Sequence, residues 1–183
     1  DGREIVGADG FIDDGDIELP VGNPPAALDA ITAECQKRLT SGDQILAIGG
    51  DHAVTFGILR AYAARYPDLS ILHFDAHPDL YDEFEGERLS HACPFARIME
   101  AGLEQRLVQV GIRTVNAHQR EQIERFKVEV IAMRDVATTP PPRFEGPVYV
   151  SFDLDALDPA FAPGVSHHEP GGLSTREALQ IIQ

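Results

Sequence analysis

Cysteine is scarce in this chain, and long apolar runs are missing. Among 183 residues only Cys35 and Cys93 occur, and their spacing fits neither a disulfide framework nor a zinc finger. No stretch approaches the roughly 18 consecutive apolar residues that a membrane span needs. Residues 1–4 lack the basic segment and apolar run of a secretory signal. These absences predict a protein of a reducing compartment, which we expect to be the cytoplasm, with an organelle after processing as the alternative.

Basic residues are also few. Lys and Arg total 15 against 30 Asp and Glu, which gives a formal net charge of −15. Such a chain repels nucleic-acid phosphates and anionic membranes, and it attracts cations. A phosphate-binding loop is missing too, because Gly49-Gly50 belongs to neither a G-x-G-x-x-G nor a Gly-Lys motif. We therefore expect no nucleic acid and no membrane as partners, whereas several buried carboxylates would need bound cations.

What the sequence does contain is a regular alternation of predicted strands and helices. The lead from Gly7 to Asp16 is predicted to be a loop. Helical periodicity and capping residues predict helices at Pro24–Ser41, Ala53–Tyr66, Pro94–Ala101, His118–Phe126 and from Ser174 to the chain end. Short apolar runs predict strands at Gln44–Ile48, Leu69–Asp75, Leu107–Ile112, Val128–Ala132 and Val148–Asp153.

This alternation predicts an α/β fold. Strands separated by helices imply right-handed crossovers, and these build a mainly parallel sheet with helices on both faces, a three-layer α/β/α arrangement. Residues 1–183 are predicted to form a single domain. Parallel sheets bind their ligands at the carboxyl ends of the strands, so the residues that follow each strand are the candidates for function.

Three predicted strand ends carry acidic or imidazole side chains. Gly49-Gly50-Asp51-His52 follows the first strand. Asp75, His77 and Asp79 follow the second at alternate positions, where extended backbone sends side chains to one side. Asp153 and Asp155 follow the last strand with the same spacing. An Asp-rich turn is usually solvated, but carboxylates repeated around imidazoles repel one another unless a cation binds.

The residue types predict a pair of divalent cations. Four carboxylates and two imidazoles without a thiolate suit octahedral ions such as Mn²⁺ better than structural zinc. We expect Asp75 and Asp153 to bridge two ions, with His52 and Asp79 on one ion and His77 and Asp155 on the other. His73 lies deeper in its strand, and we interpret it as a core histidine or one that supports the ligands.

Three motifs resemble the signatures of the ureohydrolases, the arginase and agmatinase family. They are Ile48-Gly49-Gly50-Asp51-His52, Asp75-Ala76-His77-Pro78-Asp79 and the stretch 151–159, Ser-Phe-Asp-Leu-Asp-Ala-Leu-Asp-Pro. The resemblance extends from about residue 45 to the end, is weak before that, and is strongest to plant-type arginases in 73–100 and 160–174. It implies an arginase-like fold, two Mn²⁺ per chain, and a homo-oligomer, a trimer or a hexamer.

The resemblance also implies the reaction. Metal-activated hydroxide would attack the guanidinium carbon of a small guanidino substrate, releasing urea and an amine. By the same resemblance His91 is the mobile histidine that protonates the leaving amine, and Asp155 accepts a proton as well as binding metal. His167 and Ser90 are expected to contact the substrate. L-Arginine, giving L-ornithine, is the expected substrate.

Alternatives stay open at this point. Residues 80–84 differ from the small polar segment by which animal arginases hold the substrate carboxylate, so agmatine or another guanidino acid is the alternative substrate. Family members continue for roughly another hundred residues by resemblance, so the fold is expected to be incomplete at its C-terminus and the isolated chain poorly active or unstable. A catalytically weak metal-binding or assembly domain is a further alternative, and a metal-dependent deacetylase or phosphoesterase is disfavoured by the motifs.

Overall fold

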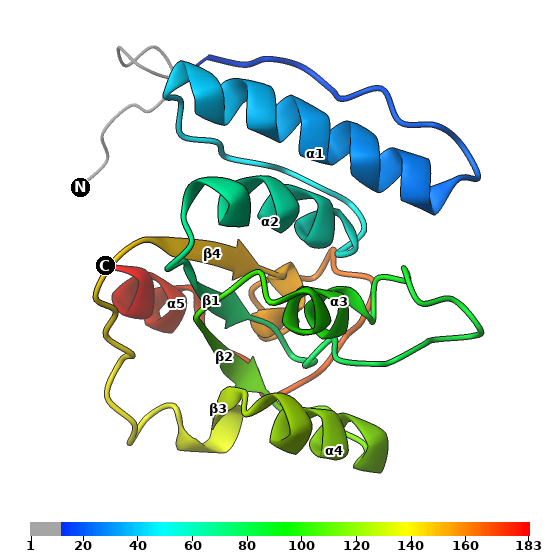
Figure 1. The fold of residues 1–183 in the computed structure, drawn as a ribbon. Helices are drawn as coiled ribbons and strands as arrows, with labels where there is room; N and C mark the ends of the chain where they lie inside the picture. The colour runs from blue at the N-terminus through cyan, green and yellow to red at the C-terminus, as the bar shows by residue number, and fades with distance from the viewer. Residues whose placement is uncertain (1–11) are drawn as a thin grey trace.

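The computed structural model describes residues 12–183 (Figure 1). In chain order the elements are α1 Pro24–Ser41, α2 Val54–Arg65, β1 Ser70–Phe74, α3 Pro94–Ala101, β2 Arg106–Ile112, α4 Ala117–Phe126, β3 Glu129–Ala132, the 3-10 turn η1 Met133–Asp135, β4 Val148–Phe152, the 3-10 turn η2 Leu154–Ala156, and α5 Thr175–Ile182. Residues 12–16 contain no helix or strand, and the rest of the loop predicted from Gly7 lies outside the described residues. Across this range, no helix is both long and apolar enough to cross a bilayer.

The four strands form one parallel sheet in the order β3-β2-β1-β4. The central strand β1 is buried along its whole length, as expected for a strand covered on both faces. Its register places His73 between Gln109 of β2 and Ser151 of β4. Because the strands are parallel, the residues after β1, β2 and β4 meet at the same edge of the sheet.

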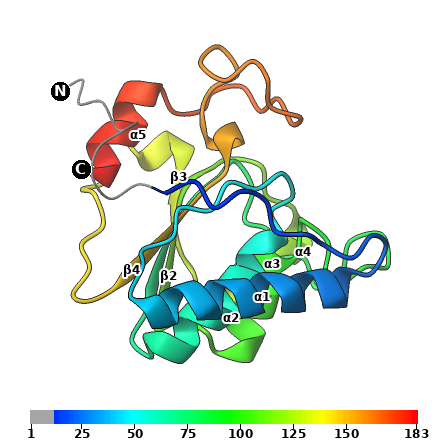
Figure 2. The same ribbon diagram turned by 90° about the horizontal axis from the view of Figure 1, so that it is seen from above.

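Helices cover both faces of this sheet, which confirms the predicted three-layer α/β/α arrangement (Figure 2). One face of β1 and β2 packs against α2, α3 and α4 through Leu59, Phe95, Ile98, Ile123 and Phe126. The opposite face packs against η2 and α5 through Ala156, Leu157 and Ala178. Helix α1 lies outside the first layer and contacts α2.

The packing of α1 on α2 depends on a glycine. Asn23 caps the start of α1 by accepting a hydrogen bond from Ala26 N, and Gly42 ends the helix in the left-handed conformation. At Gly57 of α2 an added Cβ would lie 3.0 Å from the Leu28 carbonyl oxygen, so glycine allows the two helices to approach closely. The Thr32 hydroxyl donates to the carbonyls of both Leu28 and Gly57, each at 2.8 Å, and closes this contact.

The strand predicted at Gln44–Ile48 is absent, and this prediction was wrong. The segment is irregular, with Leu46 77% and Ile48 93% exposed. Strand β4 is the outer strand of the sheet, and within residues 12–183 nothing pairs with its free edge. A strand forms where a neighbouring strand pairs with its backbone N–H and C=O groups. The segment 44–48 has an apolar β-type pattern but no such neighbour among the described residues, so it does not form a strand.

Candidate metal centre

The segment after β1 turns sharply and directs its polar side chains over the sheet edge. Asp75 Oδ1 accepts a hydrogen bond from His77 N at 2.7 Å, and Asp79 adopts a positive φ of 51°. The end of β2 lies beside this turn, where Arg113 N donates a hydrogen bond to the Ala76 carbonyl at 2.9 Å. Gly111, with φ of 94°, lets β2 come this close, since its missing Cβ would lie 3.2 Å from the Asp75 carbonyl oxygen. The backbone thereby fixes the position of the acidic turn.

The turn after β4 is tied directly to the turn after β1. Asp153 Oδ1 accepts from Asp155 N at 2.9 Å and shapes η2. Asp155 Oδ1 in turn accepts from Ala76 N at 3.0 Å. These two hydrogen bonds hold Asp153 and Asp155 against the segment that carries Asp75 and His77.

His52 enters the same place from the loop before α2. Its Nε2 lies 2.9 Å from the Ser151 hydroxyl on β4, which orients the ring. Its Nδ1 faces three carboxylate oxygens at 3.0 to 3.4 Å, which belong to Asp75, Asp79 and Asp153. Carboxylates from two distant segments, the turn after β1 and the turn after β4, thus converge on one imidazole nitrogen.

A second imidazole occupies the other half of the site. His77 Nδ1 lies 3.1 Å from Asp155 Oδ2 and 3.4 Å from Asp75 Oδ1. Asp75 therefore directs Oδ2 toward His52 and Oδ1 toward His77, which is the position predicted for a bridging ligand. The structure brings together the predicted ligands, and we call them the six-residue cluster: His52, Asp75, His77, Asp79, Asp153 and Asp155. Their roles as metal ligands stay predictions.

The charges within the six-residue cluster strongly affect one another. Burial alone would lower the pKa of His52, but the three carboxylates that face its Nδ1 raise that pKa well above its ordinary value. For His77, burial is likewise outweighed by Asp155 and Asp75, and the pKa rises to about 11. Burial, followed by the charge of Asp75, raises the pKa of Asp79 to about 7. Without a cation, protons on the imidazoles neutralise the carboxylates.

The donor set fits divalent cations. Within residues 12–183, the buried His52 Nδ1 has no hydrogen-bond partner, although three carboxylates surround it. Buried nitrogen atoms in proteins are normally hydrogen-bonded. A cation bound between His52 Nδ1 and the three carboxylates would give the nitrogen and the carboxylate oxygens a common partner. Oxygen and imidazole ligands without thiolate favour Mn²⁺ over structural zinc, in agreement with the residue types read from the sequence.

The predicted substrate and proton-transfer residues lie beside this centre. The rings of His77 and His167 are 5.9 Å apart between centroids, and those of His167 and His91 are 6.2 Å apart. His91 and His167 are exposed, and Ser90 Oγ lies 3.4 Å from His91 Nδ1. A line of rings therefore runs from the six-residue cluster to solvent, and the functions of Ser90, His91 and His167 stay predictions.

Three neighbouring residues were missed in the sequence reading. Ser151 orients His52, and Glu169 Oε1 lies 3.4 Å from His77 Nε2. Arg113 donates to the carbonyls of Asp155 and Glu169, each at 2.6 Å, and thereby joins the loops around the centre. Arg113 directly follows a predicted strand, so the rule that parallel sheets bind ligands at their carboxyl ends pointed to it.

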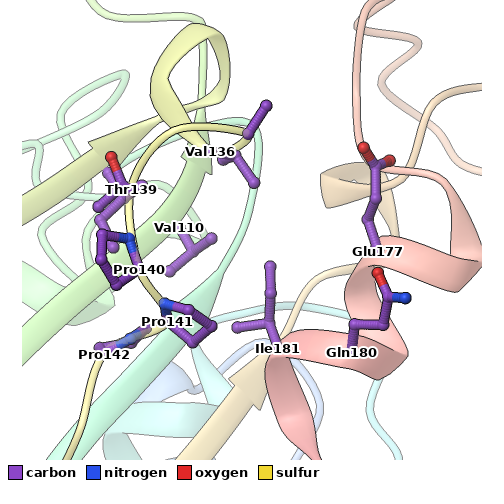
Figure 3. A pocket seen from close by; sticks show the side chains of 11 residues that line it. Val110, Val136, Thr139, Pro140, Pro141, Pro142, Glu177, Gln180 and Ile181 are labelled. Atoms are coloured by element: carbon purple, nitrogen blue, oxygen red, sulfur yellow. The ribbon is translucent and has the colours of Figure 1, made fainter.

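A groove elsewhere on the molecule is not part of this centre. Its volume is about 320 Å³, and it lies between α5 and the segment after η1 (Figure 3). Val136, Pro140, Pro141 and Ile181 give it a mainly apolar lining. The one carboxylate in its lining, Glu177, is used in the capping box of α5. The groove thus offers no cluster of catalytic or metal-binding groups.

Known arginases and agmatinases have sequences similar to this chain. An arginase of Medicago truncatula, described as mitochondrial, is 52% identical over 146 residues, which cover 75% of this chain and 43% of the relative. An agmatinase of Bacillus anthracis is 38% identical over 179 residues, which cover 94% of this chain and 60% of the relative. The chain therefore spans about half the length of the relatives it matches.

Solved structures agree with the sequence relatives. The structure of arginase from Medicago truncatula superposes with a TM-score of 0.81 at 45% identity, covering 88% of this chain and 54% of that one. A triple mutant of an arginase-like protein from T. brucei, bound with Mn²⁺, superposes with a TM-score of 0.78 at 30% identity, covering 94% and 56%. The sequence model of the Arginase family matches residues 4–183. The chain belongs to the Arginase family.

Proposed function

We propose that this chain provides the binuclear Mn²⁺ centre of a ureohydrolase that cleaves L-arginine to urea and L-ornithine. The observation that carries the proposal is the position of Asp75, whose two oxygens face His52 and His77 on opposite sides. When bound, two divalent cations lower the pKa of a shared water so that it becomes nucleophilic near neutral pH. The Mn²⁺-bound relative supports the choice of metal.

The side chains of the chain have distinct tasks in this proposal. Asp75 and Asp153 would hold both cations, His52 and Asp79 one of them, and His77 and Asp155 the other. Asp155 Oδ2, 3.1 Å from His77 Nδ1, is placed to accept the proton that the nucleophilic water loses. His91 stands at the exposed end of the ring series and would protonate the departing amine.

The substrate is proposed from charge and similarity. The carboxylates around the centre and the net charge of −15 favour a cationic guanidinium group. Greater identity to the plant arginase than to the agmatinase, 52% against 38%, supports arginine. Agmatine or a guanidino acid is the alternative, because the segment 80–84 supplies Asp82 and Glu83 where donors for an α-carboxylate are expected.

The experiment that tests the function is a substrate panel combined with metal analysis. The protein is freed of metal, supplied with Mn²⁺, and assayed for urea with arginine, agmatine and 4-guanidinobutyrate. We expect two Mn²⁺ per chain, urea chiefly from arginine with the full-length gene product and much less from residues 1–183 alone, and no urea after chelation. Two bound ions without urea from any substrate would favour a metal-binding or assembly domain, and one ion or none would contradict the binuclear centre.

Replacing His91 with asparagine is expected to slow turnover without disturbing the metal. His91 is exposed and outside the six-residue cluster, so Mn²⁺ stoichiometry should stay unchanged. Loss of a general acid lowers kcat by about 100-fold. Steady-state urea assays and metal titration measure the two effects. The control is His168→Asn, an exposed histidine in the loop 160–172 whose Nε2 lies 3.2 Å from the Pro163 carbonyl oxygen. A similar loss of kcat in both variants would contradict a general-acid role specific to His91.

Assembly and location are proposed from the same resemblance. We propose a homo-trimer or homo-hexamer, which light scattering of the purified protein can measure. For location we propose the cytoplasm or an organelle, and the Medicago truncatula relative described as mitochondrial supports the second.

A further inference from the structure

A fully buried histidine lies directly behind the bridging carboxylate. His73, on β1, has no exposed surface, and its ring stacks on Phe95 with 3.9 Å between centroids. Its Nε2 lies 2.8 Å from Asp75 Oδ2, and its Nδ1 lies 3.1 Å from the amide nitrogen of Gln109 on β2. Both ring nitrogens therefore have partners within the protein, although His73 also lies close enough to His52 and Asp75 for the three to hold a metal ion.

The orientation of Gln109 is set by the backbone. Its Nε2 donates to the Pro78 carbonyl at 2.7 Å, and a carbonyl can only accept. Reversing the amide would place Oε1 against that carbonyl oxygen. Gln109 is completely buried and sits opposite His73 in the sheet register, so its side chain has no route to solvent. The second N–H of the same amide group therefore points at His73 Nδ1.

This orientation fixes the tautomer of His73. Because Nδ1 accepts from Gln109, the ring proton resides on Nε2 and is donated to Asp75 Oδ2. Asp75 Oδ1 is held from the other side by His77 N at 2.7 Å. The carboxylate plane is thereby fixed, with Oδ2 3.3 Å from His52 Nδ1 and Oδ1 3.4 Å from His77 Nδ1.

We propose that Gln109 and His73 are positioning residues that hold the carboxylate of Asp75 between the two cations. This inference rests on the proposed function, since it assumes that Asp75 binds metal. Gln109 acts twice, because it also holds the Pro78 carbonyl within the segment 75–79 that carries three of the six cluster residues. Partners of metal ligands that fix their orientation typically change metal affinity 10- to 100-fold when they are lost.

The first test measures Mn²⁺ affinity in two variants and a matched control. Gln109→Met keeps the length of the side chain but removes the donor, and we expect Mn²⁺ binding to weaken by about 10- to 100-fold. Gln122→Met makes the same change at another buried glutamine, on α4, and should leave affinity unchanged. In His73→Gln an amide N–H can replace the Nε2 donor, and we expect affinity within a few-fold of wild type with two ions retained.

The outcomes separate this inference from the proposed function. If wild type binds two Mn²⁺ and Gln109→Met binds them equally tightly, the positioning role is overturned while the function stands. Loss of one ion in His73→Gln would make His73 a ligand and would also overturn it. A wild-type chain that binds no Mn²⁺ would contradict the proposed function itself.

The second test needs no metal. In metal-free protein with ¹⁵N-labelled histidine, the ring signals of His73 are identified by their absence from His73→Gln. We expect the tautomer with the proton on Nε2 and a bare Nδ1. A proton found on Nδ1 with Nε2 bare would overturn the inference whether or not the protein binds metal.

Discussion

Asp75→Asn is expected to abolish the paired metal centre and to lower kcat/KM for urea release by at least about 1,000-fold. The amide has one oxygen, so it can serve one cation at most, and its nitrogen cannot coordinate the other. The substitution also removes the charge that faces both His52 and His77. Losing several kcal/mol of transition-state stabilisation corresponds to this factor, since each 1.4 kcal/mol is tenfold. Metal analysis and urea assays on the same sample measure both losses.

The control for this variant is Asp29→Asn, which makes the same chemical change on the exposed surface of α1. Among the described residues 12–183, Asp29 forms an ion pair only with Arg60, and such exposed pairs contribute little to stability. The control should keep two Mn²⁺ and full activity. Retention of two tightly bound ions by Asp75→Asn would show that Asp75 does not bridge, and the proposed centre would need other ligands.

Simple local rules explain why the sequence could predict that five of the six cluster residues lie together. Asp75, His77 and Asp79 follow a buried strand at alternate positions, and Asp153 and Asp155 repeat the pattern. Parallel strands with their carboxyl ends at one edge then bring these turns together without further information. The order of strands, with β1 beside β4, completed the arrangement.

The residues that orient the ligands could not be predicted in the same way. Gln109 meets His73 only because β1 and β2 pair in one register, and a one-residue shift would point it to the other face. Arg97, which lies outside the six-residue cluster, is a second example: it is 6% exposed and donates to the Asp82 carbonyl, although an arginine in a short helix is usually expected at the surface. Such contacts depend on tertiary neighbours that no local pattern encodes.

The wrong strand at 44–48 has a similar cause. Its apolar residues carry a β-type pattern, but pairing depends on a partner at the free edge of β4. Val150 of β4 is 43% exposed, so this edge presents apolar side chains as well as unpaired backbone groups. A pattern therefore predicts strand tendency, while the neighbouring backbone decides whether a strand forms.

Arg113 shows how the loops around the metal centre are held together. Its guanidinium donates to the carbonyls of Asp155 and Glu169, and it reaches that of Leu157 at 3.4 Å. Beside it, Leu173 N donates to the Ala156 carbonyl at 2.9 Å, so the segment around Gly172 runs against η2. Because Leu173 and Arg113 are hydrogen-bonded to Ala156 and Asp155, a displacement of Gly172 would also displace Asp155.

Gly172→Ala is expected to destabilise the fold by about 3 kcal/mol, because the site has no room for a methyl group. The added Cβ would lie 2.6 Å from Asp158 N, 2.7 Å from Leu157 C and 2.7 Å from an Arg113 nitrogen. Two of these atoms belong to backbone and cannot move without opening the contact between η2 and Leu173. For a chain of this size, the loss corresponds to a fall in Tm of about 6–12 °C, measurable by calorimetry.

Gly164→Ala, in the same loop but with nothing within 4 Å of its added Cβ, should stay within about 0.5 kcal/mol of wild type. Equal stability of the two variants would mean that Arg113 and η2 do not pack as tightly as these distances require.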